Sequence, residues 1–125
     1  MTGKTALGRR GEALCADMYL KQGAQILAAN YTVRGGEIDV IAQKDDVVIF
    51  IEVKLRSSLR HGTPAEAVTT AKQKRICRTA QQFLYENGLT DAPVRFDVCE
   101  ILNTDPPQIT AIENAFDYAA DESFF

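Results

Sequence analysis

Apolar residues recur at helical spacing in two segments of this chain. The first segment covers about residues 6–22 and ends at Gly23, a residue type that commonly follows a helix. The second opens at residues 63–66 (Thr-Pro-Ala-Glu), which combine a capping hydroxyl, a proline for the first turn and a glutamate for a capping box. It could also restart near residues 69–70, and it ends at residues 87–88 (Asn-Gly). The pattern therefore predicts two helices.

Between and after these helices lie short segments rich in β-branched and apolar residues and bounded by turn residues. They predict strands at residues 25–33, 37–42, 47–54 and 94–102, with a last edge strand at 108–112. The order of elements is then α-β-β-β-α-β, followed by the edge strand. This order predicts an α/β fold in which a mixed sheet is flanked by helices.

The second and third predicted strands are the most informative part of the sequence. If they form an antiparallel hairpin centred on Asp45 and Asp46, facing positions have residue numbers that sum to 91. One side of the hairpin is then wholly apolar, as a buried sheet face requires. A slip by one residue would pair apolar residues with charged ones, so the pattern selects this register. Its apolar pairs are Ile38 with Val53, Val40 with Ile51, and Ala42 with Ile49.

On the other side of the hairpin two acidic residues meet. Asp39 lies directly opposite Glu52 in this register, and Glu37 falls opposite Lys54. Directly opposed Cβ atoms are about 5 Å apart, and two carboxylates at that distance repel by roughly 3 kcal/mol at an effective dielectric constant of about 20. This repulsion is large against the ~5–15 kcal/mol that stabilises a fold. A cation, a proton or an ammonium group is therefore expected between them.

Two interpretations of this acidic pair are open. In the first, Lys54, with Arg34 or Arg56, neutralises the acids in a structural ion-pair network. In the second, Asp39 and Glu52 hold Mg²⁺, a small hard cation that takes one or two carboxylates and keeps several waters. Lys54 would then lie beside the attacking water, where it could orient or deprotonate that water and offset charge developing on a phosphate.

Length and composition set the class of protein. With 125 residues, of which 46% are hydrophobic and 25% charged, the chain is expected to form one globular domain over residues 1–125. No apolar run approaches the ~20 residues of a membrane span, and residues 1–10 lack the apolar core of a secretion signal. Three widely spaced cysteines and one histidine exclude a usual zinc site and predict reduced thiols in a cytoplasmic protein.

Charge is distributed unevenly along the chain. The net charge is −3, but residues 1–85 contain 13 Lys and Arg against 8 Asp and Glu, whereas residues 86–125 contain one basic and nine acidic residues. A basic front part can steer a polyanion onto one face; the alternative is that these charges are scattered over a solvated surface. The candidates for contacts with nucleic-acid phosphates are Lys72, Lys74, Arg75 and Arg78 on the second helix, extended by Arg9, Arg10, Arg56, Ser57 and Arg60.

The acidic strand residues also carry a resemblance to known nucleases. Asp39, followed on the next strand by Glu52-Val53-Lys54, matches the D…(D/E)xK signature of the restriction-endonuclease-like superfamily. Longer stretches resemble the bacterial YraN-like family, a group of uncharacterised proteins similar to archaeal Holliday-junction resolvases. In chain order they read GRRGEALCADMYL, GEIDVIA, IFIEVKLRSS, AVTTAKQKRI, RFDV and IENAF, and they extend from about Gly8 to Phe116.

This resemblance implies a restriction-endonuclease-like fold with an αβββαβ core and a site for Mg²⁺ or Mn²⁺. It implies that Asp39, Glu52 and Glu12 bind the metal and that Lys54 acts with them in catalysis. The implied activity is that of an endonuclease, which hydrolyses phosphodiester bonds of branched or otherwise structured DNA. The alternative is a module that binds nucleic acid or a protein partner without catalysis and keeps the acids in a salt-bridged core.

Two further expectations follow. The residue pattern by itself places Glu12 on the solvated face of the first helix, opposite Leu14 and Met18, whereas the resemblance brings Glu12 to the metal. Junction resolvases act as dimers, because two symmetric cuts need two sites, and a homodimer would accompany that activity. No uninterrupted apolar surface stripe in the sequence marks its interface.

Overall fold

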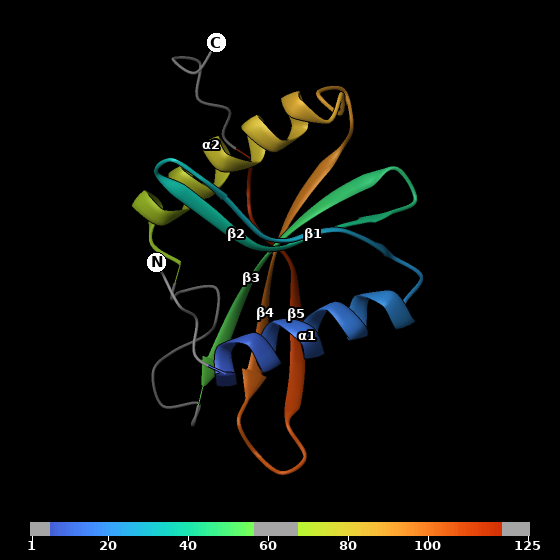
Figure 1. Ribbon diagram of the computed structural model, residues 1–125, viewed down its shortest axis with the longest axis vertical. Helices are drawn as coiled ribbons and strands as arrows, with labels where there is room; N and C mark the ends of the chain where they lie inside the picture. Colours follow the sequence, from blue (N-terminus) through green and yellow to red (C-terminus); the bar gives the residue numbers. More distant parts are fainter. Residues whose placement is uncertain (1–5, 57–67, 119–125) are drawn as a thin grey trace.

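The computed structural model describes residues 6–56 and 68–118 (Figure 1). Its elements are α1 (Ala6–Lys21), β1 (Gln25–Val33), β2 (Gly36–Lys44), β3 (Val47–Arg56), α2 (Thr70–Glu86), β4 (Val94–Leu102) and β5 (Gln108–Phe116). The predicted order of helices and strands is confirmed, and β5 is longer than predicted. The proposed helix start at residues 63–66 lies outside the described residues; α2 begins after Thr69, whose hydroxyl accepts a hydrogen bond from the backbone N–H of Lys72.

The five strands form one mixed sheet in the order β1-β2-β3-β4-β5. Neighbouring strands are antiparallel, except for β3 and β4, which run parallel from the pair Val48↔Val94 to the pair Arg56↔Leu102. Parallel strands cannot be joined by a tight turn, so the connection between them is long and carries α2. The predicted α/β fold, a mixed sheet flanked by helices, is confirmed.

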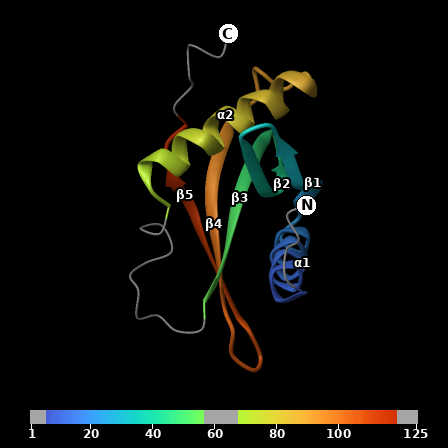
Figure 2. The same cartoon turned by 60° about the vertical axis from the view of Figure 1, so that its left-hand side comes forward.

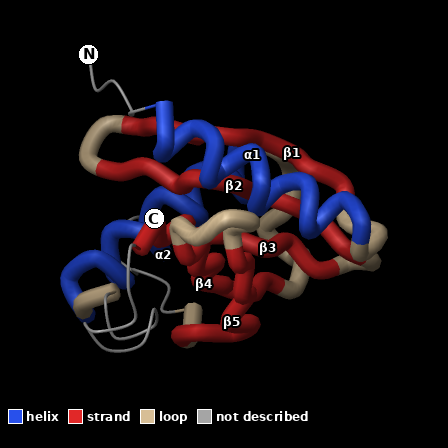
Figure 3. Tube along the Cα trace, turned by 90° about the horizontal axis from the view of Figure 1, so that it is seen from below, coloured by secondary structure: helices blue, strands red, loops and turns tan. Residues whose placement is uncertain are grey.

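Helices α1 and α2 pack on opposite faces of this sheet (Figures 2 and 3). Alternate residues of β3 show the division. Val48 and Phe50 join the apolar cluster under α2, whereas Ile49 and Ile51 join the cluster under α1. A strand covered on both faces needs an unbroken apolar run, which is why residues 47–51 contain no polar residue.

The predicted hairpin register is confirmed for the part of β2 and β3 nearest their turn. Val40 pairs with Ile51, and the pairing continues to Lys44 and Val47. The predicted pairing of Ile38 with Val53 is wrong. The ladder between the two strands ends at Val40, and Ile38 belongs to the cluster under α2, whereas Val40 belongs to the cluster under α1.

A bend in the neighbouring strand accounts for this difference. Asn30 of β1 has a left-handed φ of 54° and lies between the pairs Ala29↔Val40 and Tyr31↔Ile38. A left-handed residue interrupts the alternation of an extended strand and increases its local twist. Because β2 follows its partner through the bend, Ile38 and Val40 face opposite sides of the sheet. Asp39 lies at the bend itself.

The composition bears on two further features of the described residues. Cys15, Cys77 and Cys99 are buried, and none of them forms a disulfide within the described residues. Within residues 6–56 and 68–118, neither helix has the length and apolar character needed to cross a bilayer.

Candidate functional site

The candidate site opens where β2 and β3 stop pairing. Beyond the pair Val40↔Ile51, β3 continues to Arg56 along its other neighbour, β4. At the point of separation the backbone N–H of Val53 donates a hydrogen bond of 2.8 Å to Asp39 Oδ2, where a regular ladder would place a backbone acceptor. This contact fixes the Asp39 carboxylate between the two diverging strands.

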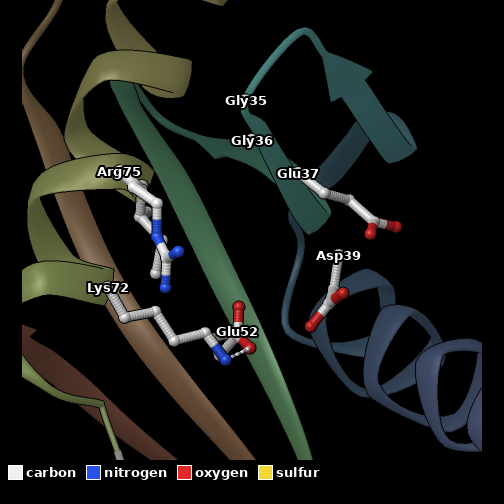
Figure 4. Close-up of a pocket in the computed structure, with 8 residues that line it drawn as sticks. Gly35, Gly36, Glu37, Asp39, Glu52, Lys72 and Arg75 are labelled. Atoms are coloured by element: carbon white, nitrogen blue, oxygen red, sulfur yellow. Dashed lines mark ion pairs between the residues drawn. The ribbon is translucent and has the colours of Figure 1, made fainter.

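A cavity of about 290 Å³ lies between the diverging strands and the start of α2 (Figure 4). The side chains of Asp39 and Glu52 point into this hollow from β2 and β3, and those of Lys72 and Arg75 reach into it from α2. The structure thus brings the two predicted acids to one cavity from separate strands. The described residues that line it are Gly35, Gly36, Glu37, Asp39, Glu52, Lys72, Arg75 and Ile76.

Close packing of Gly36 against α2 sets one wall of the cavity. A Cβ atom on Gly36 would collide with Oγ1 of Thr79, whose hydroxyl donates a hydrogen bond of 2.8 Å to the carbonyl oxygen of Arg75. A glycine is therefore needed for the backbone of β2 to approach the helix this closely. The contact holds the start of β2, and Asp39 with it, in front of the first turns of α2.

Two lysines share one oxygen atom of Glu52. Lys72 Nζ lies 2.7 Å from Glu52 Oε1, and Lys54 Nζ lies 3.6 Å from the same atom. Burial, together with repulsion from Asp39, raises the pKa of Glu52 above its ordinary value. Burial, together with the neighbouring Lys72, lowers the pKa of Lys54. Compared with the same side chains in water, Glu52 is therefore more readily protonated and Lys54 more readily neutral.

The nearer of the two lysines at Glu52, Lys72, comes from α2. Our ion-pair interpretation assigned that part to Lys54, with Arg34 or Arg56, and did not include Lys72. The sequence signal for Lys72 is the capping hydroxyl of Thr69, which places Lys72 in the first turn of the second helix. Its contact with Glu52 depends on how the helix packs on the sheet, which the sequence pattern does not show.

The donor set of the cavity fits a hard divalent cation. Mg²⁺ is commonly bound through one or two carboxylates while it keeps several waters, and Asp39 and Glu52 supply that number. Within residues 6–56 and 68–118 no three His, Cys, Asp or Glu side chains are gathered for a metal. The geometry therefore favours a partly hydrated ion over an all-protein cage. Burial and the neighbouring Asp39 disfavour the ionised form of Glu52, and a bound cation would stabilise that form.

Glu12 occupies a buried position on α1. Its exposed fraction is 7%, and it shares the inward face of the helix with Gly11, Cys15 and Tyr19. The expectation from periodicity that Glu12 is solvated is wrong. The reason is the close packing of α1 on the sheet at Gly11, where a Cβ atom would lie 3.3 Å from Cδ1 of Ile101 on β4 and 3.8 Å from Cγ1 of Val53 on β3. Glu12 is thus close to the strand that carries Glu52, although it is not among the described residues that line the cavity.

The predicted phosphate-contacting residues are distributed over several places. On α2, Lys72 and Arg75 line the cavity, Arg78 lines a neighbouring cavity, and Lys74 is exposed. Arg9 and Arg10 are exposed on α1. Ser57 and Arg60 lie outside the described residues.

Arg56, a further candidate phosphate contact, is buried in an ion pair with Glu100. Its Nε lies 3.2 Å from Glu100 Oε2, and its side chain is 11% exposed. A guanidinium paired and buried in this way is not placed to bind phosphate from solvent. Arg56 therefore stabilises the fold through its pair with Glu100.

Asp97 forms a separate buried acidic centre on β4. Its carboxylate accepts hydrogen bonds from the hydroxyl of Tyr19 over 2.7 Å, from Nε of Arg95 over 2.9 Å and from the backbone N–H of Asn114 over 2.9 Å. Four heavy-atom contacts, including Arg95 Nη2 at 3.0 Å, satisfy both oxygens. This network makes Asp97 structural.

Comparison with known proteins identifies relatives along most of the chain. The model of the uncharacterised protein family UPF0102 matches residues 11–101. The chain belongs to the UPF0102 family. A UPF0102 protein of Chloroherpeton thalassium is 39% identical over 125 residues, which cover 100% of this chain and 93% of the relative. A UPF0102 protein of Clostridioides difficile is 41% identical over 109 residues, covering 87% of this chain and 95% of the relative.

The UPF0102 match contains the residues that form the candidate site. Glu12, Asp39, Glu52 and Lys54 lie within residues 11–101, and so do the basic residues of α2. A further UPF0102 protein, from Symbiobacterium thermophilum, is 46% identical over 95 residues, covering 76% of this chain and 80% of the relative. The resemblance stated from the motifs is confirmed at the level of the UPF0102 family.

Proposed function

We propose that this UPF0102 protein is a nucleic-acid-binding endonuclease of the restriction-endonuclease-like superfamily that uses Mg²⁺ or Mn²⁺. The observation that carries the proposal is the arrangement of three residues. Asp39 and Glu52 point into one cavity from separate strands, and Lys54 Nζ lies 3.6 Å from Glu52. This is the arrangement that the D…(D/E)xK signature requires.

The topology supports the same proposal. The chain contains the α-β-β-β-α-β order of the superfamily's core, and the acids lie where β2 and β3 diverge. The divergence leaves a hollow open to a ligand, whereas a continued ladder would close it. Basic residues of α2 border the hollow and could hold the phosphate backbone of DNA.

Three acids and one lysine would act together in the reaction. Asp39 and Glu52, with a backbone carbonyl next to Glu52, would hold the metal, and Glu12 would complete or bridge the site. The bound metal would supply a nucleophile active at neutral pH and stabilise charge on the phosphate. Lys54, whose lowered pKa favours the neutral amine, would orient the attacking water or accept its proton.

The reaction is hydrolysis of a phosphodiester bond. The oxygen of the attacking water forms a bond to phosphorus, and the bond from phosphorus to the 3′ oxygen breaks in line with it. The products are a 5′ phosphate and a 3′ hydroxyl group. Lys72 and Arg75 would offset the negative charge that develops on the phosphate oxygens. Paired cuts in a branched substrate would need two copies of the chain, so the proposal includes a homodimer on such DNA.

A cleavage assay with Mg²⁺ or Mn²⁺ on branched and linear DNA tests the proposal. Asp39→Asn and Lys54→Ala should each lower the cleavage rate by about 10²-fold or more, because each removes a group needed in the transition state. Asp46→Asn is the matched control, since Asp46 is an exposed acid in the turn between β2 and β3. Equal cutting by all four proteins would point to a contaminating nuclease and overturn the proposal.

One observation favours a second candidate, a nucleic-acid-binding module without catalysis. Lys72 lies 2.7 Å from Glu52 and already supplies a cation to the acids. This candidate predicts DNA binding with no uptake of Mn²⁺ in calorimetry. The nuclease proposal predicts Mn²⁺ uptake that is lost in Asp39→Asn.

A further inference from the structure

A second cavity lies beside the candidate active site. It has a volume of about 220 Å³ and is bounded by the turn between β1 and β2 on one side and by α2 on the other. Its described lining residues are Val33, Arg34, Gly35, Arg75, Arg78, Thr79 and Gln82. Gly35 and Arg75 line both cavities, so the two hollows are neighbours that share a wall.

The two cavities have opposite charge. The first is lined by the acids Glu37, Asp39 and Glu52 as well as by basic residues, whereas the described lining of the second contains three arginines and no acid. Arg34 comes from the turn, and Arg75 and Arg78 come from successive turns of one helix face, where residues three apart are neighbours. The three arginines give this hollow a positive charge, with no carboxylate in its described lining, and a positive hollow favours an anion.

The Thr79 hydroxyl and the Gln82 amide also line the second cavity, and both make hydrogen bonds within α2. The Thr79 hydroxyl donates to the carbonyl oxygen of Arg75 over 2.8 Å, and the Gln82 amide donates to Glu86 over 2.9 Å. Recognition in this cavity therefore depends on the guanidinium groups. Their planar sets of N–H donors match phosphate oxygens in pairs, which makes arginine the usual side chain for binding phosphate.

We infer that this cavity binds a backbone phosphate of the nucleic-acid chain whose neighbouring phosphate occupies the acidic cavity. The inference rests on the proposed function, and it names Arg34, Arg75 and Arg78 as the residues of a phosphate subsite. Arg75 borders both cavities and would lie between the two phosphates. A subsite of this kind holds the strand in register for cleavage and reads no base, so its contribution is independent of sequence.

The packing of the turn supports a preformed subsite. Arg34 directly precedes Gly35 and Gly36, and the backbone of Gly36 lies against Thr79 so closely that a Cβ atom would collide with the threonine side chain. The turn is therefore held on the helix that carries Arg75 and Arg78. Arg34 lies about forty residues before them in the chain, and no sequence pattern predicted that it would lie with them.

The test measures binding rather than cleavage. Fluorescence anisotropy follows a short labelled duplex in EDTA, so that metal-dependent cleavage does not interfere, for wild type, Arg34→Gln and Arg78→Gln. Lys44→Gln is the matched control, because Lys44 is an exposed cation at the opposite end of β2. Thermal unfolding of each variant confirms that the exposed substitutions leave the fold intact.

Each arginine substitution is expected to weaken binding at low salt by about tenfold, since a charge-assisted contact is lost. It should also reduce the slope of log K against log salt concentration by about 0.9. Lys44→Gln should change affinity by less than about twofold, the scale of an isolated surface charge. Duplexes with and without a 5′ phosphate should give equal results, because the ligand is a backbone diester.

The outcomes separate this inference from the proposed function. If wild type binds DNA and the arginine variants bind as tightly as Lys44→Gln, the subsite is refuted while the nuclease proposal stands. An arginine effect seen only with 5′-phosphorylated DNA would refute the backbone assignment in favour of a terminal phosphate. If the arginine effect is present but Mg²⁺ and Mn²⁺ support no cleavage, the subsite stands and the nuclease proposal fails. Absence of DNA binding by wild type refutes both.

Discussion

Two acidic centres are buried in the same sheet, and their charges are compensated in different ways. Asp97 receives four contacts from Tyr19, Arg95 and Asn114, all within 3.0 Å, and its side chain has no exposed surface. Asp39 and Glu52 instead point into a cavity, where Glu52 shares one oxygen between two lysines. The first centre is complete within the protein, whereas the second is open to a ligand.

A residue with left-handed backbone geometry lies next to each acidic centre. Asn30 of β1 has a φ of 54° next to Asp39, and Asn114 of β5 has a φ of 53° next to Asp97. At Asp97 the backbone N–H of the left-handed residue, Asn114, donates a hydrogen bond to the carboxylate, so the carboxylate occupies the break in the strand pairing. At Asp39 the donor is Val53 on the other neighbouring strand, and β2 and β3 separate beyond it. The same local distortion therefore closes one centre and opens the other.

The comparison predicts its largest effect on stability at Asp97. Asp97→Ala should lower the free energy of unfolding by about 3–5 kcal/mol, because Arg95 and the Tyr19 hydroxyl lose a buried partner. Urea denaturation measures this loss, with Asp46→Ala in an exposed turn as the control. A loss below about 1 kcal/mol would show that Asp97 is not a closed structural centre.

The open centre should respond to metal. Mn²⁺ at a concentration 100 times its Kd should raise the free energy of unfolding by about 2.7 kcal/mol, since it binds the folded state. Asp39→Asn should abolish this gain, and Asp46→Asn should retain it. Equal stabilisation of wild type and Asp39→Asn in thermal unfolding would place the metal elsewhere and break the contrast between the two centres.

Glu52→Gln should have the smallest effect on stability without metal, within about 1 kcal/mol of wild type. The substitution removes the ion pair with Lys72, but it also removes the repulsion from Asp39 and the cost of burying a charge. A raised pKa in the folded state means that wild type loses stability as pH rises through that pKa. Glu52→Gln has no carboxyl group to titrate at this position and should not lose stability in that pH range. Its free energy of unfolding relative to wild type should therefore rise with pH. Denaturation curves from acidic to neutral pH check the sign, and a relative decline would contradict it.

Part of this structure could be predicted from nearby residues. The hairpin register follows from the alternation of residues 40–44 and 47–51 around a short turn, and the paired strands confirm it. The same reasoning failed at Ile38, because the bend is set by Asn30 on the other neighbouring strand. It failed again at Glu12, because the sheet approaches α1 at Gly11 and buries a residue that periodicity places outside.

The sequence by itself determined the order of helices and strands, the pairing of β2 with β3 near their turn, and the presence of Asp39, Glu52 and Lys54 on neighbouring strands. These depend on spacing within short segments, where backbone geometry leaves few choices. The tertiary structure decided the separation of β2 from β3, the approach of Lys72 to Glu52, and the gathering of Arg34 with Arg75 and Arg78. These depend on the packing of a turn and a helix about forty residues apart, because side chains distant in sequence meet only after both faces of the sheet are covered.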